Sequence, residues 1–237
     1  IIKRKFNNKM ILPMIILFVL GGLQGAIGWI MVSSGLVPEK YFVGHIELAT
    51  HFIAALGLLC YTLWFALSLW IQPQQKVFNM GLQQLMTGII VILFFQLVYG
   101  AFMAGLKAAI SAPTWPDING SIIPASMDEL YPWSKNLVSN NITVHFIHRG
   151  LAYLLSVLVI IWWLKAKALK ESLLFNRLRS SVIALTLLQV VLGIFTVLNA
   201  TYTNRLIVLG VLHQCTAMLL LMSAVTILYI LRKNTVA

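Results

Sequence analysis

The sequence has few charged residues, and this scarcity excludes an ordinary soluble domain. Only 10% of its 237 residues are charged and 60% are hydrophobic, whereas roughly 25% of residues are charged in soluble domains. Acidic residues are the scarcest, since 6 Asp and Glu stand against 17 Lys and Arg and give a net charge of +11. This composition predicts an integral membrane protein.

Cysteine is also scarce. The two cysteines, Cys60 and Cys215, both lie inside apolar runs and form no C-x-x-C pair, so neither a disulfide framework nor a zinc motif is indicated. The start of the sequence has no pattern of a cleavable signal peptide. The basic residues fall between apolar runs and form no basic face, which argues against nucleic acid as a partner.

The apolar runs predict an all-α membrane fold. A membrane helix needs about 20 apolar residues, and its backbone polar groups must be satisfied within the helix. Six segments meet this length, at 11–34, 42–71, 81–106, 143–164, 180–199 and 206–231. We therefore predict six visible transmembrane helices.

The basic residues predict the orientation of these helices. Twelve lie on the side of the two termini and four or five lie on the other side, where Lys40, Lys107, Lys135 and Arg205 are found, with Arg149 at a helix mouth. Since basic residues accumulate in the cytoplasm, both visible termini are predicted to be cytoplasmic, in an inner (plasma) membrane. The long connection 107–142, rich in aromatic residues and proline, then lies outside as an ordered cap.

A repeat unit of two helices occurs three times. Alternate helices carry a Q-x-x-x-G motif, and the helix that follows each motif carries a histidine near its outer end. The three Gln, Gly and His sets are Gln24, Gly28 and His51; Gln96, Gly100 and His148; and Gln189, Gly193 and His213. A small residue lets a neighbouring helix approach closely, and Gln can form a hydrogen bond across the interface.

The histidines are candidate ligands for haem iron. His51, His148 and His213 lie at one depth in the predicted bundle, and two neutral imidazoles can hold haem iron between helices. Zinc is the rival metal, but it prefers four ligands that often include Cys or carboxylate, and no acidic residue accompanies His148 or His213. A hydrogen bond between helices is the alternative role for each histidine.

The remaining polar residues near the helix mouths receive lesser roles. His45 and His145 lie closer to the interface, where hydrogen bonding is the favoured interpretation. Arg149 follows His148 and is a candidate partner for a haem propionate. Cys215 points to a different face from His213 and is interpreted as a small packing residue.

The number of ligands predicts more helices than are visible. His148 and His213 form one pair in the second half, which leaves His51 alone. A further helix pair before Ile1 would supply its partner and complete an eight-helix protein made of two pseudo-symmetric four-helix bundles. On this hypothesis, residues 1–80 are the remainder of an N-terminal half and 81–237 form a C-terminal four-helix bundle.

These motifs resemble those of the heme A synthase family. The similarity extends over essentially the whole chain. It is carried by GGLQG (21–25), GWIMV (28–32), SGL (34–36), LATHF (48–52), AFMAG (101–105), TWP (114–116), IP (123–124), FIHR (146–149), LAY (151–153), QVVLG (189–193) and LHQ (212–214).

The resemblance implies an enzyme that oxidises the C8 methyl group of haem O to a formyl group, giving haem A for terminal oxidases. It implies haem b between His148 and His213, and the substrate haem at His51 with a histidine of an earlier E-x-x-H-R helix. The catalytic glutamate of the family would lie before Ile1. Heme O synthase, an electron acceptor and a second copy of the chain are the expected partners.

The chain also departs from the family pattern. Ile46-Glu47 stands where the family usually has Tyr-Arg, and His45 and His145 are additional to its usual set. Two other functions remain open at this point. One is a membrane b-type cytochrome that only transfers electrons, and the other is a haem chaperone or transporter.

Overall fold

The computed structural model describes residues 7–169 and 172–233, and within them all the regular structure is helical. Six helices in this part of the chain are long and apolar enough to cross a membrane. They are α1 (Asn8–Ser33), α2 (His45–Trp70), α3 (Met80–Gly105), α6 (Asn141–Ala166), α7 (Leu173–Leu198) and α8 (Thr203–Ile230). The prediction of an all-α, multi-pass membrane protein is confirmed.

Side-chain caps explain where several of these helices begin. The side chain of Asn79 accepts a hydrogen bond from the backbone N–H of Leu82 at 2.9 Å, and Asn140 accepts one from Ile142 at 2.9 Å. Such caps satisfy N–H groups that the first turn of a helix leaves free. Hydropathy does not register these polar residues, so the predicted starts of α3 and α6 fall one and two residues late.

The predicted start of α7 at residue 180 is wrong by a larger margin. The helix begins at Leu173, after Ser172 accepts a hydrogen bond from the backbone N–H of Phe175 at 3.4 Å. Arg177 and Arg179, which a start at residue 180 leaves outside the helix, both lie within α7. Arg179 donates to the carbonyl oxygen of Ala166 at 2.8 Å, which joins α7 to the end of α6.

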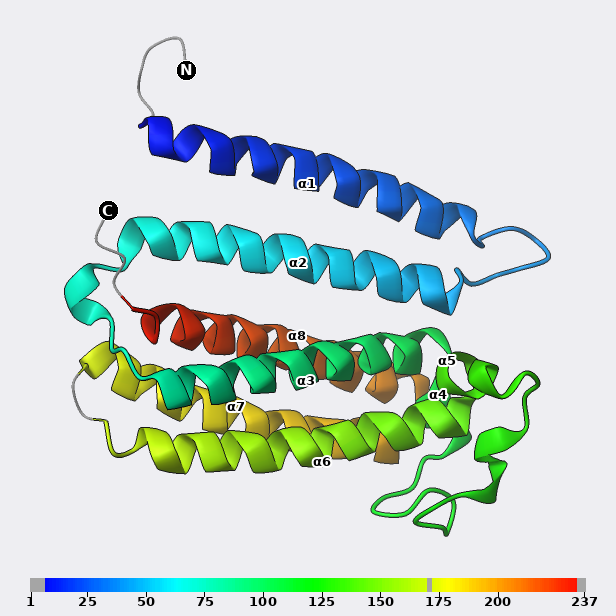
Figure 1. Cartoon of the computed structure of the whole chain (residues 1–237). Coiled ribbons are helices and arrows are strands. Elements are labelled where there is room, and N and C mark those ends of the chain that lie inside the picture. The colour runs from blue at the N-terminus through cyan, green and yellow to red at the C-terminus, as the bar shows by residue number, and fades with distance from the viewer. Residues whose placement is uncertain (1–6, 170–171, 234–237) are drawn as a thin grey trace.

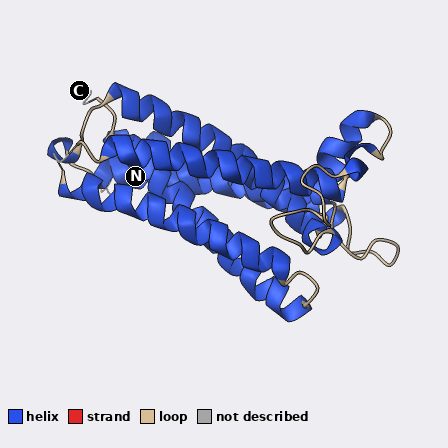
Figure 2. Cartoon of the chain, turned by 90° about the horizontal axis from the view of Figure 1, so that it is seen from below, coloured by secondary structure: helices blue, strands red, loops and turns tan. Residues whose placement is uncertain are grey.

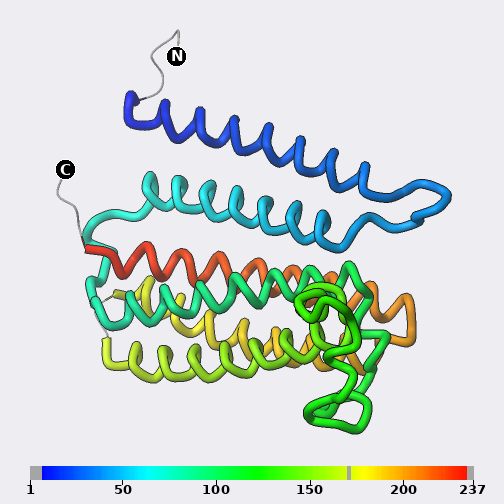
Figure 3. Tube along the Cα trace, turned by 45° about the vertical axis from the view of Figure 1, so that its right-hand side comes forward, coloured from blue at the N-terminus to red at the C-terminus, as the bar shows by residue number. Residues whose placement is uncertain are grey.

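Four of the long helices, α3, α6, α7 and α8, form a bundle, and α1 and α2 lie beside it as a hairpin (Figure 1). Helix α2 packs on α3 and α8, whereas α1 lies on the outside against α2, as Figure 3 also shows. Of the α1 residues described, Asn8–Ser33, none is buried. The division at residue 80 stays a prediction.

The best-packed core lies at one end of the bundle. Four large side chains, one from each bundle helix, are fully buried there: Met86, Trp162, Phe175 and Ile227. The indole N–H of Trp162 donates to the carbonyl oxygen of Leu82 at 3.1 Å. These residues lie where α3 and α7 begin and where α6 and α8 end, so the opposite end of the bundle is left for the site.

The long connection folds at that opposite end (Figure 2). It contains the short helices α4 (Ala108–Ser111) and α5 (Asn136–Ser139) and two 3-10 turns. The buried side chain of Asn136 donates to the carbonyl oxygens of Leu130 and Trp133 at 2.9 and 3.0 Å. The hydroxyl of Thr143 on α6 donates to the carbonyl oxygen of Met127 at 2.7 Å. The prediction of an ordered cap therefore agrees with the structure.

Candidate functional site

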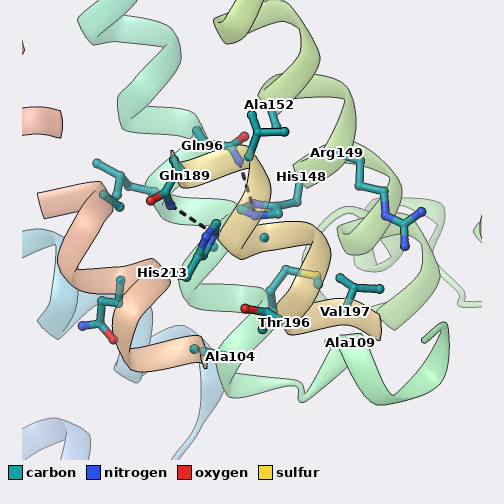
Figure 4. Close-up of a pocket in the computed structure, with 18 of the residues that line it drawn as sticks. Gln96, Ala104, Ala109, His148, Arg149, Ala152, Gln189, Thr196, Val197 and His213 are labelled. Carbon is teal, nitrogen blue, oxygen red and sulfur yellow. Dashed lines mark hydrogen bonds between the residues drawn. The ribbon is translucent and has the colours of Figure 1, made fainter. Parts of the chain in front are cut away.

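A cavity of about 510 Å³ lies between the bundle helices at the end covered by the long connection. Its walls come mainly from α3, α6, α7 and α8, and Trp115 of the connection lines its outer part. The cavity is mostly apolar and falls within the size range of sites for cofactors, about 300–1,000 Å³. Its few polar side chains include His148, His213 and Arg149 (Figure 4).

His148 of α6 and His213 of α8 face each other across this cavity. Their ring centroids are 6.5 Å apart and their planes are inclined by 70°. Metal–imidazole bonds are about 2 Å long, so two imidazoles on opposite sides of one metal ion would have centroids about 6 Å apart. The spacing therefore suits a metal held between the two rings, as in haem with two histidine ligands.

The nitrogen atoms of these two rings support the same interpretation. Nδ1 of His148 and Nδ1 of His213 are buried and have no hydrogen-bond partner among the residues that the structure describes. Buried polar atoms without a partner are uncommon and call for an explanation, such as a ligand that is bound in the functional protein. The donor set thus fits a bis-histidine haem iron.

The repeated Gln and Gly residues hold the histidine rings. The amide Nε2 of Gln96 lies 3.3 Å from Nε2 of His148, and that of Gln189 lies 3.1 Å from Nε2 of His213 (Figure 4). A Cβ atom at Gly193 would lie 3.0 Å from Cε1 of His213. Each Gln therefore contacts the histidine of its own helix pair, and the Gly four residues later leaves room for the ring.

His51 has the same kind of partner but lies apart from the cavity. The amide Nε2 of Gln24 on α1 is 3.2 Å from Nδ1 and 3.4 Å from Nε2 of the ring. A Cβ atom at Gly28 would lie 2.9 Å from Cε1 of His51. The structure therefore brings together two of the three predicted ligands and leaves the third on the α1–α2 hairpin.

Arg149 fastens the connection to α6. Its Nη1 donates to the carbonyl oxygen of Asp117 at 2.6 Å, and its Nη2 donates to that of Thr114 at 2.5 Å. Its Nε donates to Nε2 of the fully buried His145 at 2.9 Å. The guanidinium lines the cavity, but these hydrogen bonds occupy much of its capacity to donate.

The turn beside Arg149 carries a perturbed carboxyl group. The backbone N–H of Gly120 donates to Oδ1 of Asp117 at 2.8 Å. This hydrogen bond, followed by the Thr114 hydroxyl, holds the pKa of Asp117 below its ordinary value, because both favour the charged carboxylate.

Residues 1–225 match the COX15-CtaA family, whose description is cytochrome oxidase assembly protein. The chain belongs to this family.

Similar proteins of the COX15-CtaA type are named as heme A synthases. The heme A synthase of Wolbachia pipientis wMel is 33% identical over 236 residues, which cover 99% of this chain and 64% of that protein. The heme A synthase of Sinorhizobium medicae is 36% identical over 92% of this chain and 58% of that protein. The heme A synthase of Bradyrhizobium sp. strain ORS 278 is 37% identical over 89% of this chain and 57% of that protein. The chain thus spans about three fifths of the length of these relatives.

Two other polar residues of this COX15-CtaA chain, His45 and Cys215, do not line the cavity. His45 packs its ring edge-to-face on Phe102 and lies 3.4 Å from the hydroxyl of Ser139, as expected of a hydrogen-bonding residue. Cys215 is exposed, so it faces away from the site but is not the packing residue that we predicted. Within the described segments, no group of three or more His, Cys, Asp or Glu residues could hold a metal.

The sequence motifs did not identify Lys107 as a residue of the cavity. Lys107 lines the cavity, and its Nζ lies 3.2 Å from the ring centroid of Phe42, in the α1–α2 connection. Its backbone has a φ of 54°, which few residues other than glycine adopt. The sequence also did not reveal the carbonyl oxygens that bind Arg149, because every residue type has a main-chain oxygen and no motif marks the ones that are used.

Proposed function

We propose that this chain is the haem b-binding part of a heme A synthase, which oxidises the C8 methyl group of haem O to a formyl group. The observation that carries the proposal is the pair of facing imidazoles, His148 and His213, each with an unpartnered Nδ1 at a largely apolar cavity. The heme A synthases among the relatives, 33% to 37% identical, support the reaction.

Each candidate residue has a distinct task in this proposal. His148 and His213 would hold the haem iron, and the apolar walls of the cavity would keep water away from the bound haem. Haem b, when bound, supplies one-electron transfer away from the methyl group under oxidation. His51 holds the substrate haem, and its hydrogen bond from Gln24 restrains the ring that faces the substrate.

Arg149 has two tasks at the mouth of the cavity. Its positive charge suits a haem propionate, because a guanidinium binds carboxylates with paired hydrogen bonds. Its bonds to the carbonyl oxygens of Thr114 and Asp117 keep the connection in place over the cavity. Arg149 would therefore bind a haem propionate at the side of the cavity where Trp115 of the connection also lines it.

The setting follows from the charge pattern and the helix directions. The start of α1 and the end of α8 lie at the end of the molecule opposite the long connection (Figure 1). With both termini in the cytoplasm, the haem sites lie toward the outer side of the inner membrane. Heme O synthase is the expected source of substrate, and a membrane electron acceptor is the expected partner for reoxidation.

Haem analysis tests the proposal against its main alternative, a b-type cytochrome that only transfers electrons. The full-length gene is expressed in cells that make haem O but no haem A, and the extracted haems are separated by chromatography. Appearance of the formyl-bearing haem A supports the synthase. Bound haem b with haem O left unconverted favours the cytochrome, and readily exchanged haem without redox activity favours a chaperone or transporter.

A further inference from the structure

Gln96 and Gln189 each present a buried amide to the ring of a candidate haem ligand. Their side-chain nitrogens lie 3.3 and 3.1 Å from Nε2 of His148 and His213. Within residues 7–169 and 172–233, four buried atoms of this group lack a hydrogen-bond partner, namely Oε1 of both glutamines and Nδ1 of both histidines. Four such atoms in one cluster require a common explanation, because buried polar atoms are nearly always paired.

The two orientations of each amide have different consequences for the imidazole. If the amide nitrogen faces the ring, it donates to the ring lone pair, and the proton of the neutral imidazole then occupies Nδ1, which cannot bind a metal. If the amide oxygen faces the ring, it accepts the ring N–H, and Nδ1 keeps its lone pair. The two orientations have nearly the same shape, so half a turn of the amide converts one into the other.

We propose that Gln96 and Gln189 are positioning residues whose Oε1 atoms accept the ring N–H of His148 and His213 and so fix the tautomer that ligates haem iron. This inference rests on the haem b site proposed above. All four unpartnered atoms are then satisfied, the oxygens by the ring N–H groups and Nδ1 by the iron. Metal-bound histidines usually donate their other N–H in this way, which also raises the basicity of the ligand.

The third glutamine of the repeat lies outside this proposal. The amide nitrogen of Gln24 donates to the backbone carbonyl oxygen of His51 at 3.1 Å, in addition to its contacts with the ring. Its Oε1 is also buried without a partner among the described residues, but turning this oxygen toward the ring would break the hydrogen bond to the carbonyl oxygen. Gln24 therefore acts as a donor, and the acceptor role belongs to Gln96 and Gln189.

The experiment measures the reduction potential and haem affinity of the purified full chain loaded with haem b. Gln189→Glu and Gln96→Glu keep an acceptor oxygen, add negative charge beside the ring N–H and should shift the potential to more negative values with haem retained. Gln189→Leu and Gln96→Leu remove the acceptor, and should shift the potential to more positive values and weaken haem binding about 10- to 100-fold.

Gln84→Glu is the matched control, because it adds the same charge to α3 at an exposed position 12 residues before Gln96, roughly 18 Å away. It should leave the potential unchanged. Shifts of opposite sign for the Glu and Leu variants support the inference. A different outcome is that the unsubstituted chain binds haem b with a normal spectrum while the Glu and Leu variants keep its potential or shift it with the same sign. That result refutes the positioning role and leaves the haem site standing. Failure of the unsubstituted chain to bind haem b refutes both.

Discussion

The α1–α2 hairpin and the four-helix bundle contain the same Gln, Gly and His arrangement in different surroundings. In the bundle, two copies of the arrangement place His148 and His213 on opposite sides of one cavity, 6.5 Å apart. In the hairpin, His51 has its Gln24 partner, but it is not among the residues that line this cavity.

This difference shows that restraining one imidazole ring is not sufficient to form a site for a metal ion. The Gln and Gly residues restrain one ring within one helix pair, and they do so in the hairpin as in the bundle. A site for haem iron needs a second ring across a cavity, which arises from the packing of one pair on another. The bundle has that packing, whereas α1 packs chiefly on α2 and has no buried residue within Asn8–Ser33.

Removal of a single ligand should give the largest difference between the two regions. We expect His148→Ala and His213→Ala to abolish the low-spin haem b spectrum, since each removes one of the two proposed iron ligands, and His51→Ala largely to spare it. Optical and paramagnetic resonance spectra of the purified chain measure this. Loss of the signal in His51→Ala but not in His213→Ala would show that the two regions have been assigned the wrong way round.

Removal of a core aromatic side chain should separate the regions by stability. Trp162 is 0% exposed and donates to the carbonyl oxygen of Leu82, and substitution of such a residue by Ala costs about 3–5 kcal/mol. Trp29 on α1 is 74% exposed, so Trp29→Ala should change stability little. Thermal unfolding in detergent compares the two, and equal losses would contradict the packing difference.

Crowding of the histidine rings should have a smaller effect. A Cβ atom at Gly193 would lie 3.0 Å from Cε1 of His213, so Gly193→Ala should displace the ring, at a cost of about 1–3 kcal/mol, and lower haem b occupancy. Gly28→Ala crowds His51 in the same way, at 2.9 Å, and should leave haem b unchanged.

Gly150→Ala is the control for this substitution, because a Cβ atom there meets nothing within 4 Å in the described part of the chain. Haem titration measures the haem b occupancy of the three variants and so ranks the effects of the substitutions. A drop in haem b occupancy for Gly150→Ala equal to that for Gly193→Ala would show that ring displacement is not the cause.

The smallest effect concerns the pH dependence of the connection. The pKa of Asp117 is lowered mainly by the N–H of Gly120, so its contribution to stability is present above the unfolded pKa of about 3.9 and is lost as the pH falls through the lower, folded value. We expect the turn at 117–120 to loosen only in acid and the α1–α2 hairpin not to respond. Tryptophan fluorescence measured against pH detects the loosening of the turn, with Asp117→Asn as the comparison. Identical fluorescence profiles for the two proteins would contradict the expected role of the Asp117 carboxylate.

Much of the fold could be predicted because lipid imposes strict requirements on sequence. Apolar runs of sufficient length identify all six long helices. The error at α7 arose because Arg177 and Arg179 extend a helix past the apolar region, where charge no longer excludes helical structure. Hydropathy measures the apolar span, whereas a side-chain cap such as Ser172 determines where the helix begins.

The part of the site that could be predicted is the part built from the repeated Gln, Gly and His motif. The spacing of Gln and Gly pointed to a contact between paired helices, and the structure places each Gln on the histidine of its own pair. The hydrogen bonds of Arg149 were not predictable, since its partners are main-chain oxygens brought close by the fold of the connection. The role of His145 as an acceptor for Arg149 depends on the same arrangement.

The attachment of the connection by Arg149 has a consequence for how this segment can diverge. The guanidinium binds the carbonyl oxygens of Thr114, Pro116 and Asp117, and every amino acid has a carbonyl oxygen. A change of side chain at these positions that preserves the backbone path therefore leaves the attachment intact, whereas loss of Arg149 removes it at all three points. The stretch 114–117 is thus free to change its side chains, while Arg149 keeps its backbone attached to α6 beside the separate attachment that Thr143 makes at Met127.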